Sequence, residues 1–415
     1  MKKIFFVCLA ILLSYCLLET FSFVGHRMLK NKYCQSLSSS GAKTYEVNRW
    51  NENPTVHPYI GYVQTFNNEN KNHVSDYGFF DTKSPIQNKA SDKIIIGIFG
   101  GSVAWHVSEE GMEALEKTLR KTTFLSNKHF VFLNFSNGGY KQPQQLMILN
   151  YILALGGHLD LLINLDGFNE VALPAAENIP NNIFPFFPRS WPDIVGLMIS
   201  DKKVLFMSKI INLETKKKTI EDFFSIPPLR HICTLHLIYD CLNQSLSSEI
   251  SKERLELFEM RDSHSAYAAK GPSYHPHSQK EMYQDLANVW KNSSLQIHKI
   301  CTANGIRYFH FLQPTQYLPH SKTMGKEELQ IAILEGMPYQ KPVEEGYPYL
   351  LKAGSELVKE GVNFFDLTQL FKKNNEIIYA DNCCHVNKQG NEILGNAIGE
   401  RISEFYSEKV PSLRQ

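Results

Sequence analysis

The chain has 415 residues, enough for two to three average domains or for one domain with long insertions. Hydrophobic residues make up 43% and charged residues 20%, which excludes both a disordered chain and a multispan membrane protein. Because 43 lysines and arginines balance 42 acidic residues, no net basic field attracts phosphates, and we expect no nucleic-acid partner.

The first 25 residues predict a segment that meets a bilayer. Lys2 and Lys3 precede a mostly apolar run over residues 4–24, which at about 1.5 Å per residue is long enough to cross the hydrocarbon layer. No small-x-small cleavage site follows, so we favour an uncleaved single-pass anchor over a cleaved signal peptide or a buried core helix. We expect a membrane-anchored protein with its main domain on the extracytoplasmic side, secreted if the signal is cleaved.

Cysteine usage leaves the pairing open. Six cysteines follow the apolar run: Cys34, Cys233, Cys241, Cys301, Cys383 and Cys384. An even count permits disulfides in an oxidising compartment, and buried free thiols are the alternative. Neither these residues nor any repeat predicts an oligomeric state.

Residues 26–92 form a tether and a lead-in to the main domain. They are rich in Ser, Asn and Pro, and residues 59–80 carry aromatics that we expect to pack on the domain. Regular structure then begins. Five short apolar runs alternate with segments whose apolar residues recur at helical spacing. The runs cover residues 94–99, 130–135, 159–165, 306–312 and 362–367.

This alternation predicts a doubly wound, flavodoxin-like sheet of five parallel strands over residues 93–410. Residues 171–278 interrupt it, and four prolines between 180 and 192 predict a long irregular insertion. A last helix begins after Asn387, a favourable cap. In such a sheet ligands lie beyond the carboxyl ends of the strands, so chemistry is expected there.

Ser102 follows the first strand in the sequence Gly100-Gly101-Ser102. Two glycines let the backbone turn sharply, and a serine at this turn projects its hydroxyl over the strand ends. A phosphate-binding turn or a plain loop would carry the same three residues, so the motif is weak alone.

Two further blocks follow the second and third strands. Gly139 lies in Asn-Gly-Gly-Tyr, where a bare backbone N–H is available, and Asn169 lies in Asp-Gly-Phe-Asn-Glu, where a side-chain amide is available. Such donors stabilise the oxyanion of an acyl-transfer transition state. Each block alone is also an ordinary turn.

The fourth block is Asp-Asn-Cys-Cys-His, from Asp381 to His385, just before the last helix. A histidine held by a carboxylate can take the proton of a serine hydroxyl. Cys383, Cys384 and His385 are also possible metal ligands, but no second Cys/His pair at zinc spacing accompanies them. We therefore expect neither a metal nor a cofactor.

Taken together, the four blocks resemble those of the SGNH (GDSL-like) hydrolases, exported bacterial type, over about residues 93–406. Gly-Gly-Ser resembles the nucleophile block, Gly139 the oxyanion glycine, Gly-Phe-Asn-Glu the third block, and the block ending in His385 the terminal one. The segment 309–317, a strand ending in Leu-Gln-Pro, adds to this similarity. The resemblance implies a three-layer sandwich.

The function implied by this resemblance is that of a serine ester hydrolase on an exported or envelope ester, of a small molecule or a glycan. Ser102 would be the nucleophile, His385 the base and Asp381 its partner, and the N–H groups of Ser102 and Gly139 with the Asn169 amide would form the oxyanion hole. The alternatives are an O-acyltransferase acting on a polysaccharide and an inactive module that binds a glycan or partner.

Three positions depart from the family pattern. Gly101 and Glu170 replace acidic residues of the nucleophile and third blocks, but neither position holds a reacting atom. Asp381 lies four residues before His385, one more than in the family, so a one-residue bulge is needed for contact. Asp366 is the substitute if that contact fails.

Overall fold

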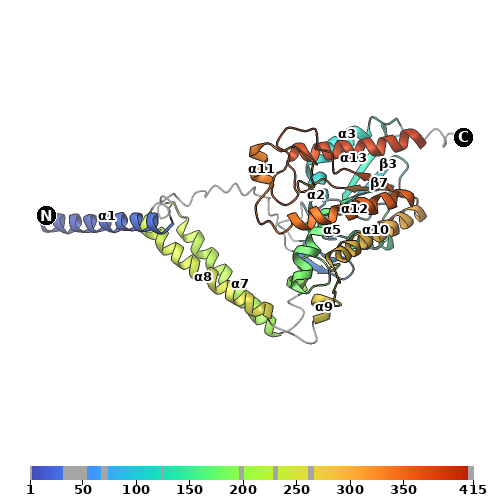
Figure 1. The fold of residues 1–415 in the computed structure, drawn as a ribbon. Coiled ribbons are helices and arrows are strands. Elements are labelled where there is room, and N and C mark those ends of the chain that lie inside the picture. Colours follow the sequence, from blue (N-terminus) through green and yellow to red (C-terminus); the bar gives the residue numbers. More distant parts are fainter. Residues whose placement is uncertain are drawn as a thin grey trace. The chain divides into compact units, whose positions relative to one another are not determined.

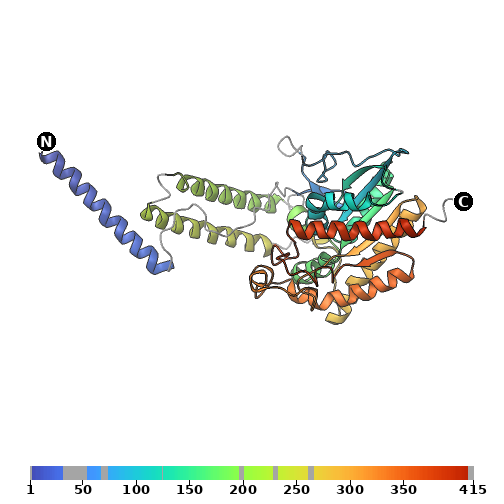
Figure 2. The ribbon, with the colours of Figure 1, turned by 90° about the horizontal axis from the view of Figure 1, so that it is seen from above.

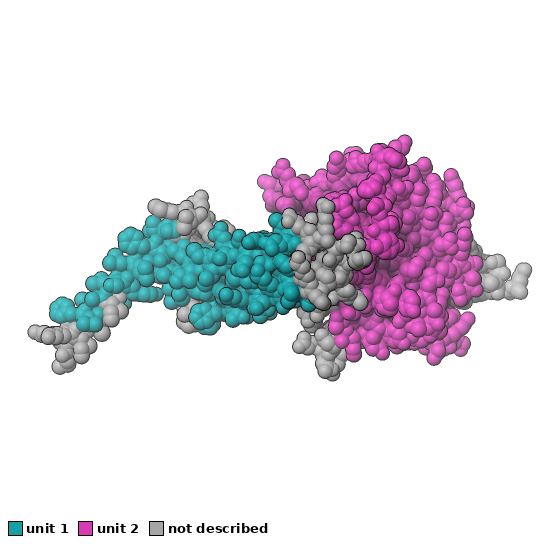
Figure 3. Space-filling model, turned by 90° about the horizontal axis from the view of Figure 1, so that it is seen from below, with its two compact units in different colours: residues 1–51, 196–266 teal, residues 52–195, 267–415 magenta. Residues whose placement is uncertain are grey.

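The computed structural model describes residues 2–30, 54–66, 73–123, 125–195, 201–227, 232–259 and 266–409. The chain divides into two compact units (Figure 3). Unit 1 contains Met1–Asn51 and Gly196–Ala266, and unit 2 contains Glu52–Val195 and Tyr267–Gln415. The part of the predicted tether at residues 31–53 lies outside the described residues.

Unit 2 is built on a five-stranded parallel sheet. Its strands are β3 (Lys93–Gly100), β4 (His129–Asn134), β5 (Leu161–Asp166), β6 (Arg307–Leu312) and β7 (Asn363–Asp366), in the order β4-β3-β5-β6-β7. This is the flavodoxin-like order, with the chain reversing direction across the sheet after β3 and β4. The α/β class and the five parallel strands predicted from the sequence are confirmed.

Helices cover both faces of this sheet (Figures 1 and 2). Helix α3 (Met112–Leu119) contacts α13 (Lys388–Lys409) on one face. On the other, α10 (Gln279–Ala303) contacts both α12 (Gln340–Lys359) and α4 (Gln144–Ala154). The strand residues between them are apolar and fully buried, as a sheet covered on both faces requires; they include Ile96, Phe99, Leu162, Phe309 and Phe311.

A short hairpin precedes the sheet. Strands β1 (Pro54–His57) and β2 (Gly61–Gln64) pair antiparallel, and Tyr62 and Val63 are buried in the main core. The Tyr62 hydroxyl donates to the Gly138 carbonyl at 2.6 Å, and the Tyr140 hydroxyl donates to the Tyr62 carbonyl at 2.6 Å. These bonds tie the hairpin to the loop that follows β4.

The predicted irregular stretch over residues 171–278 is wrong for residues 201–224 and 233–259, which are helical. Short elements come first: α5 (Phe168–Leu173), η2 (Pro174–Asn178), η3 (Ile179–Asn181) and α6 (Trp191–Val195). Two long helices follow, α7 (Asp201–Phe224) and α8 (Cys233–Glu259), which contact each other within unit 1. The four prolines that suggested irregularity lie between residues 180 and 192. They therefore carry no information about the two helices that follow.

The N-terminal segment forms helix α1 (Lys2–Lys30). Among the residues that the structure describes, no helix is both long and apolar enough to cross a membrane, so the predicted anchor over residues 4–24 is not supported. Polar residues interrupt its second half. The Glu19 carboxylate accepts hydrogen bonds from the Cys233 N–H and from Thr234, whose hydroxyl lies 2.7 Å away, at the start of α8.

The remaining elements are short. Helix α2 (Ser102–His106) and the π-helix η1 (Val107–Gly111) lead without a break into α3, while α9 (Ala266–Lys270) and α11 (Lys326–Ala332) lie in loops. Cys233 is disulfide-bonded, and the free cysteines include Cys241, Cys301, Cys383 and Cys384.

Candidate active site

Ser102 lies at the carboxyl end of β3, as the sequence predicted, and is the first residue of α2. Gly100 makes the turn possible. Its φ is +146°, and a Cβ there would lie 2.1 Å from the Leu165 carbonyl oxygen of β5, so only glycine fits. As the first residue of its helix, Ser102 has an N–H without an intrahelical acceptor.

His385 reaches Ser102 from the loop before α13. Its Nε2 lies 2.7 Å from the Ser102 Oγ, and its Nδ1 lies 2.5 Å from Asp381 Oδ2. The structure therefore brings the three predicted residues into one hydrogen-bonded chain. The nucleophile and base are within the reach that proton transfer requires.

The extra residue between Asp381 and His385 is absorbed by a tight turn. Asp381 Oδ1 accepts hydrogen bonds from the N–H groups of Cys383, at 2.9 Å, and His385, at 3.2 Å. Residues Tyr379 and Val386 form an isolated antiparallel bridge that closes the loop. Asp366 was the alternative partner for His385. Its carboxylate instead accepts a hydrogen bond from the N–H of Thr368, two residues along the chain, at 2.8 Å.

Electrostatics favour proton uptake by His385. Burial lowers its pKa, but the hydrogen bond and negative charge of Asp381 outweigh burial, and the pKa is raised. Burial raises the pKa of Asp381, but the same contact and the two backbone N–H groups outweigh it, and the pKa is lowered. The carboxylate thus stabilises the imidazolium that forms when a hydroxyl proton is taken.

The predicted amide donor, Asn169, lies directly against the nucleophile turn. Its Nδ2 donates to the Tyr140 carbonyl at 2.8 Å, and a Cβ on Gly101 would lie 2.3 Å from the same nitrogen. Any side chain at 101 would therefore displace this amide. One of the two Nδ2 hydrogens remains for another acceptor.

Gly139 follows β4 and has a φ of +77°. A Cβ there would lie 2.8 Å from Arg189 Cδ, so glycine is required both by conformation and by close approach. Its N–H has no acceptor among the residues that the structure describes. It belongs to the same loop as Tyr140, which accepts the Asn169 amide.

Glu170 holds the second and third blocks together. Its carboxylate accepts the N–H of Gly167 at 2.7 Å and that of Gln142 at 3.1 Å. Burial and the nearby Asp166 raise its pKa to about 8, although the backbone N–H groups oppose this. The residue is therefore a structural clamp between the loops that carry Gly139 and Asn169.

Sequence reasoning missed three residues around this site. The His106 ring centroid lies 5.1 Å from that of His385, and burial and that neighbour lower its pKa to about 4, so it stays neutral. Gln316 Nε2 donates to the carbonyls of Asp381, at 3.3 Å, and Cys383, at 3.0 Å. Tyr317 donates to the Asn382 carbonyl.

A usable signal existed for one of these residues. His106 lies one helical turn after Ser102, a spacing that places both on one helix face. Gln316 and Tyr317 follow β6 at the carboxyl edge of the sheet, but nothing local in the sequence links them to residue 381.

No family model and no curated protein matches the chain. Among solved structures, the chain is similar to one titled "Crystal structure of an acetyl xylan esterase AlAXEase". The identity is 10%, the match covers 74% of this chain and 100% of that chain, and the TM-score is 0.34. A likeness of this degree carries no argument about fold or activity.

Proposed function

We propose that the chain is a serine ester hydrolase of the SGNH type. The supporting observation is the hydrogen-bonded chain from Ser102 Oγ through both ring nitrogens of His385 to Asp381 Oδ2. It also argues against the alternative of an inactive binding module. That alternative rested on the spacing of Asp381 and His385, which is one residue longer than in the SGNH pattern.

In the proposed reaction Ser102 Oγ attacks an ester carbonyl while His385 Nε2 takes its proton. Asp381 holds the ring through Nδ1 and stabilises the imidazolium, which then protonates the leaving alcohol. The oxyanion would accept from the N–H groups of Ser102 and Gly139 and from the spare Nδ2 hydrogen of Asn169. Water, activated by the same imidazole, then cleaves the acyl-serine.

The proposed substrate is an ester of a small molecule or a glycan, outside the cytoplasm. The disulfide at Cys233 supports this location, because such bonds persist in oxidising compartments. A second hydroxyl in place of water would make the same residues an acyltransferase.

Hydrolysis of p-nitrophenyl acetate tests the proposal. We expect turnover by the wild type and by Ser108→Ala, a control serine in η1 whose hydroxyl donates to the Ala104 carbonyl at 2.9 Å. We expect Ser102→Ala to lose at least about 1,000-fold in kcat. Equal rates in all three proteins would reject Ser102 as nucleophile, and acetylated product formed only with an added oligosaccharide would favour transfer.

A further inference from the structure

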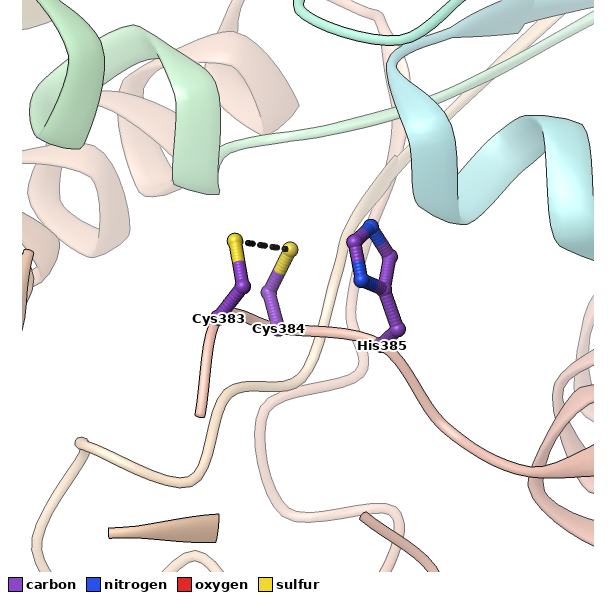
Figure 4. A group of neighbouring side chains, drawn as sticks. All are labelled: Cys383, Cys384 and His385. Atoms are coloured by element: carbon purple, nitrogen blue, oxygen red, sulfur yellow. Dashed lines mark hydrogen bonds between the residues drawn. The ribbon is translucent and has the colours of Figure 1, made fainter. Parts of the chain in front are cut away.

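Two thiols lie beside the proposed base. Cys383 Sγ and Cys384 Sγ are 3.7 Å apart, and each lies within 4.8 Å of a ring nitrogen of His385. Figure 4 shows the three side chains projecting from the same side of the loop. Esterase chemistry uses neither sulfur.

The spacing of the two sulfurs matches a shared ion. Two thiolates bound to a tetrahedral Zn²⁺ at about 2.3 Å are about 3.8 Å apart, while a disulfide needs about 2.0 Å. Thiolate and imidazole are the ligands that zinc-class ions prefer. Within the described residues, these three form the single group with metal-ligand donors so close together.

The loop holds the pair in place and leaves it accessible. Gln316 fixes the Cys383 carbonyl, and Asp381 fixes the Cys383 N–H. Cys384 is buried, with 2% of its surface exposed, whereas Cys383 is half-buried. An ion can therefore approach from the side of Cys383 without unfolding the loop.

We propose that Cys383, Cys384 and His385 form an inhibitory site for a thiophilic divalent cation of the zinc class. Both ring nitrogens of His385 are already engaged, Nε2 by Ser102 and Nδ1 by Asp381. Whichever nitrogen binds the ion loses that partner, so the bound ion removes the base. Three protein ligands leave a fourth position for water. The inhibition, though not the binding, rests on the proposed esterase function.

Binding is tested with Co²⁺ as a spectroscopic probe on the chelator-stripped full chain with its Cys233 disulfide intact. We expect one Co²⁺ per chain with thiolate-to-cobalt absorption in the wild type, in Ser102→Ala, and in Cys241→Ser, whose exposed free thiol lies in α8. Cys383→Ser and Cys384→Ser should bind at least about 100-fold more weakly, since even changes beyond the ligands cost about 10- to 100-fold.

Absence of this absorption in the folded wild type, or its persistence in Cys383→Ser, overturns the site. Cys383→Ser carries the test if the buried Cys384→Ser does not fold.

Inhibition is measured as ester hydrolysis with and without Zn²⁺, each protein against its own metal-free rate. Zn²⁺ should lower the rate of hydrolysis by at least about tenfold in the wild type and in Cys241→Ser. In Cys383→Ser it should lower the rate by less than about twofold. Equal inhibition of all three overturns the proposal. Cobalt binding with no hydrolysis in any variant would reject the esterase function alone, and hydrolysis without cobalt binding would reject the metal site alone.

Discussion

At the scale of single residues, the contact between Asp381 and His385 decides how the site works. Replacing Asp381 with Asn keeps the size but removes the charge that stabilises the imidazolium and selects the tautomer. We expect kcat/KM for Asp381→Asn to fall at least about 100-fold. Asp366→Asn is the matched control, since its carboxylate bonds to Thr368. Comparable losses in both variants would contradict the assignment.

The pH profile provides an independent check of the same contact. His385 acts as a base only when neutral, so activity should rise as pH passes its pKa, which Asp381 holds above the ordinary value of 6.5. In Asp381→Asn the residual activity should rise at lower pH. An unchanged midpoint would mean that the carboxylate does not act on the ring.

Gly101 and Asn169 should behave as one unit, because a Cβ at 101 displaces the Asn169 amide. Gly101→Ala and Asn169→Ala are each expected to lower kcat by about 100-fold or more, the usual effect of one oxyanion donor. The double variant should lose little more than either single variant. Additive losses would show that the two residues act separately.

At the scale of elements, the close approach of β3 and β5 depends on Gly100. Gly100→Ala combines a strained φ with a backbone clash and should lower the free energy of unfolding by about 2–4 kcal/mol. Gly305→Ala is the control: its φ is +71° with nothing within 4 Å of the added Cβ, so about 1 kcal/mol is expected. Denaturant unfolding measures the free energy of unfolding of both variants. Equal decreases would show that the clash with the Leu165 carbonyl does not contribute.

The sequence predicted the sheet well because short buried strands and their glycine endings are local signals. For the same reason it placed Ser102, Gly139 and Asn169 at one edge of the sheet, because each of them follows a strand. Gln316 could not be assigned, since its partners lie 65 and 67 residues away along the chain. Helices α7 and α8 were missed because their apolar residues form no single stripe.

At the scale of the whole molecule, all the proposed catalytic residues and the sheet lie in unit 2. Residues 196–266 leave and re-enter this unit at nearby points, since Trp191 Nε1 donates to the Ala268 carbonyl at 2.7 Å. Replacing residues 196–266 with a short Gly/Ser linker should therefore retain hydrolysis of p-nitrophenyl acetate at the wild-type level. Loss of turnover in a folded protein would show that residues 196–266 take part in the reaction.

The central claim, that Ser102 is a nucleophile activated by His385, is tested most directly by covalent labelling with a fluorophosphonate. Peptide mapping by mass spectrometry should find one adduct per chain, on Ser102, and none in Ser102→Ala. A folded wild type that stays unlabelled, or an adduct on another serine, would contradict the account.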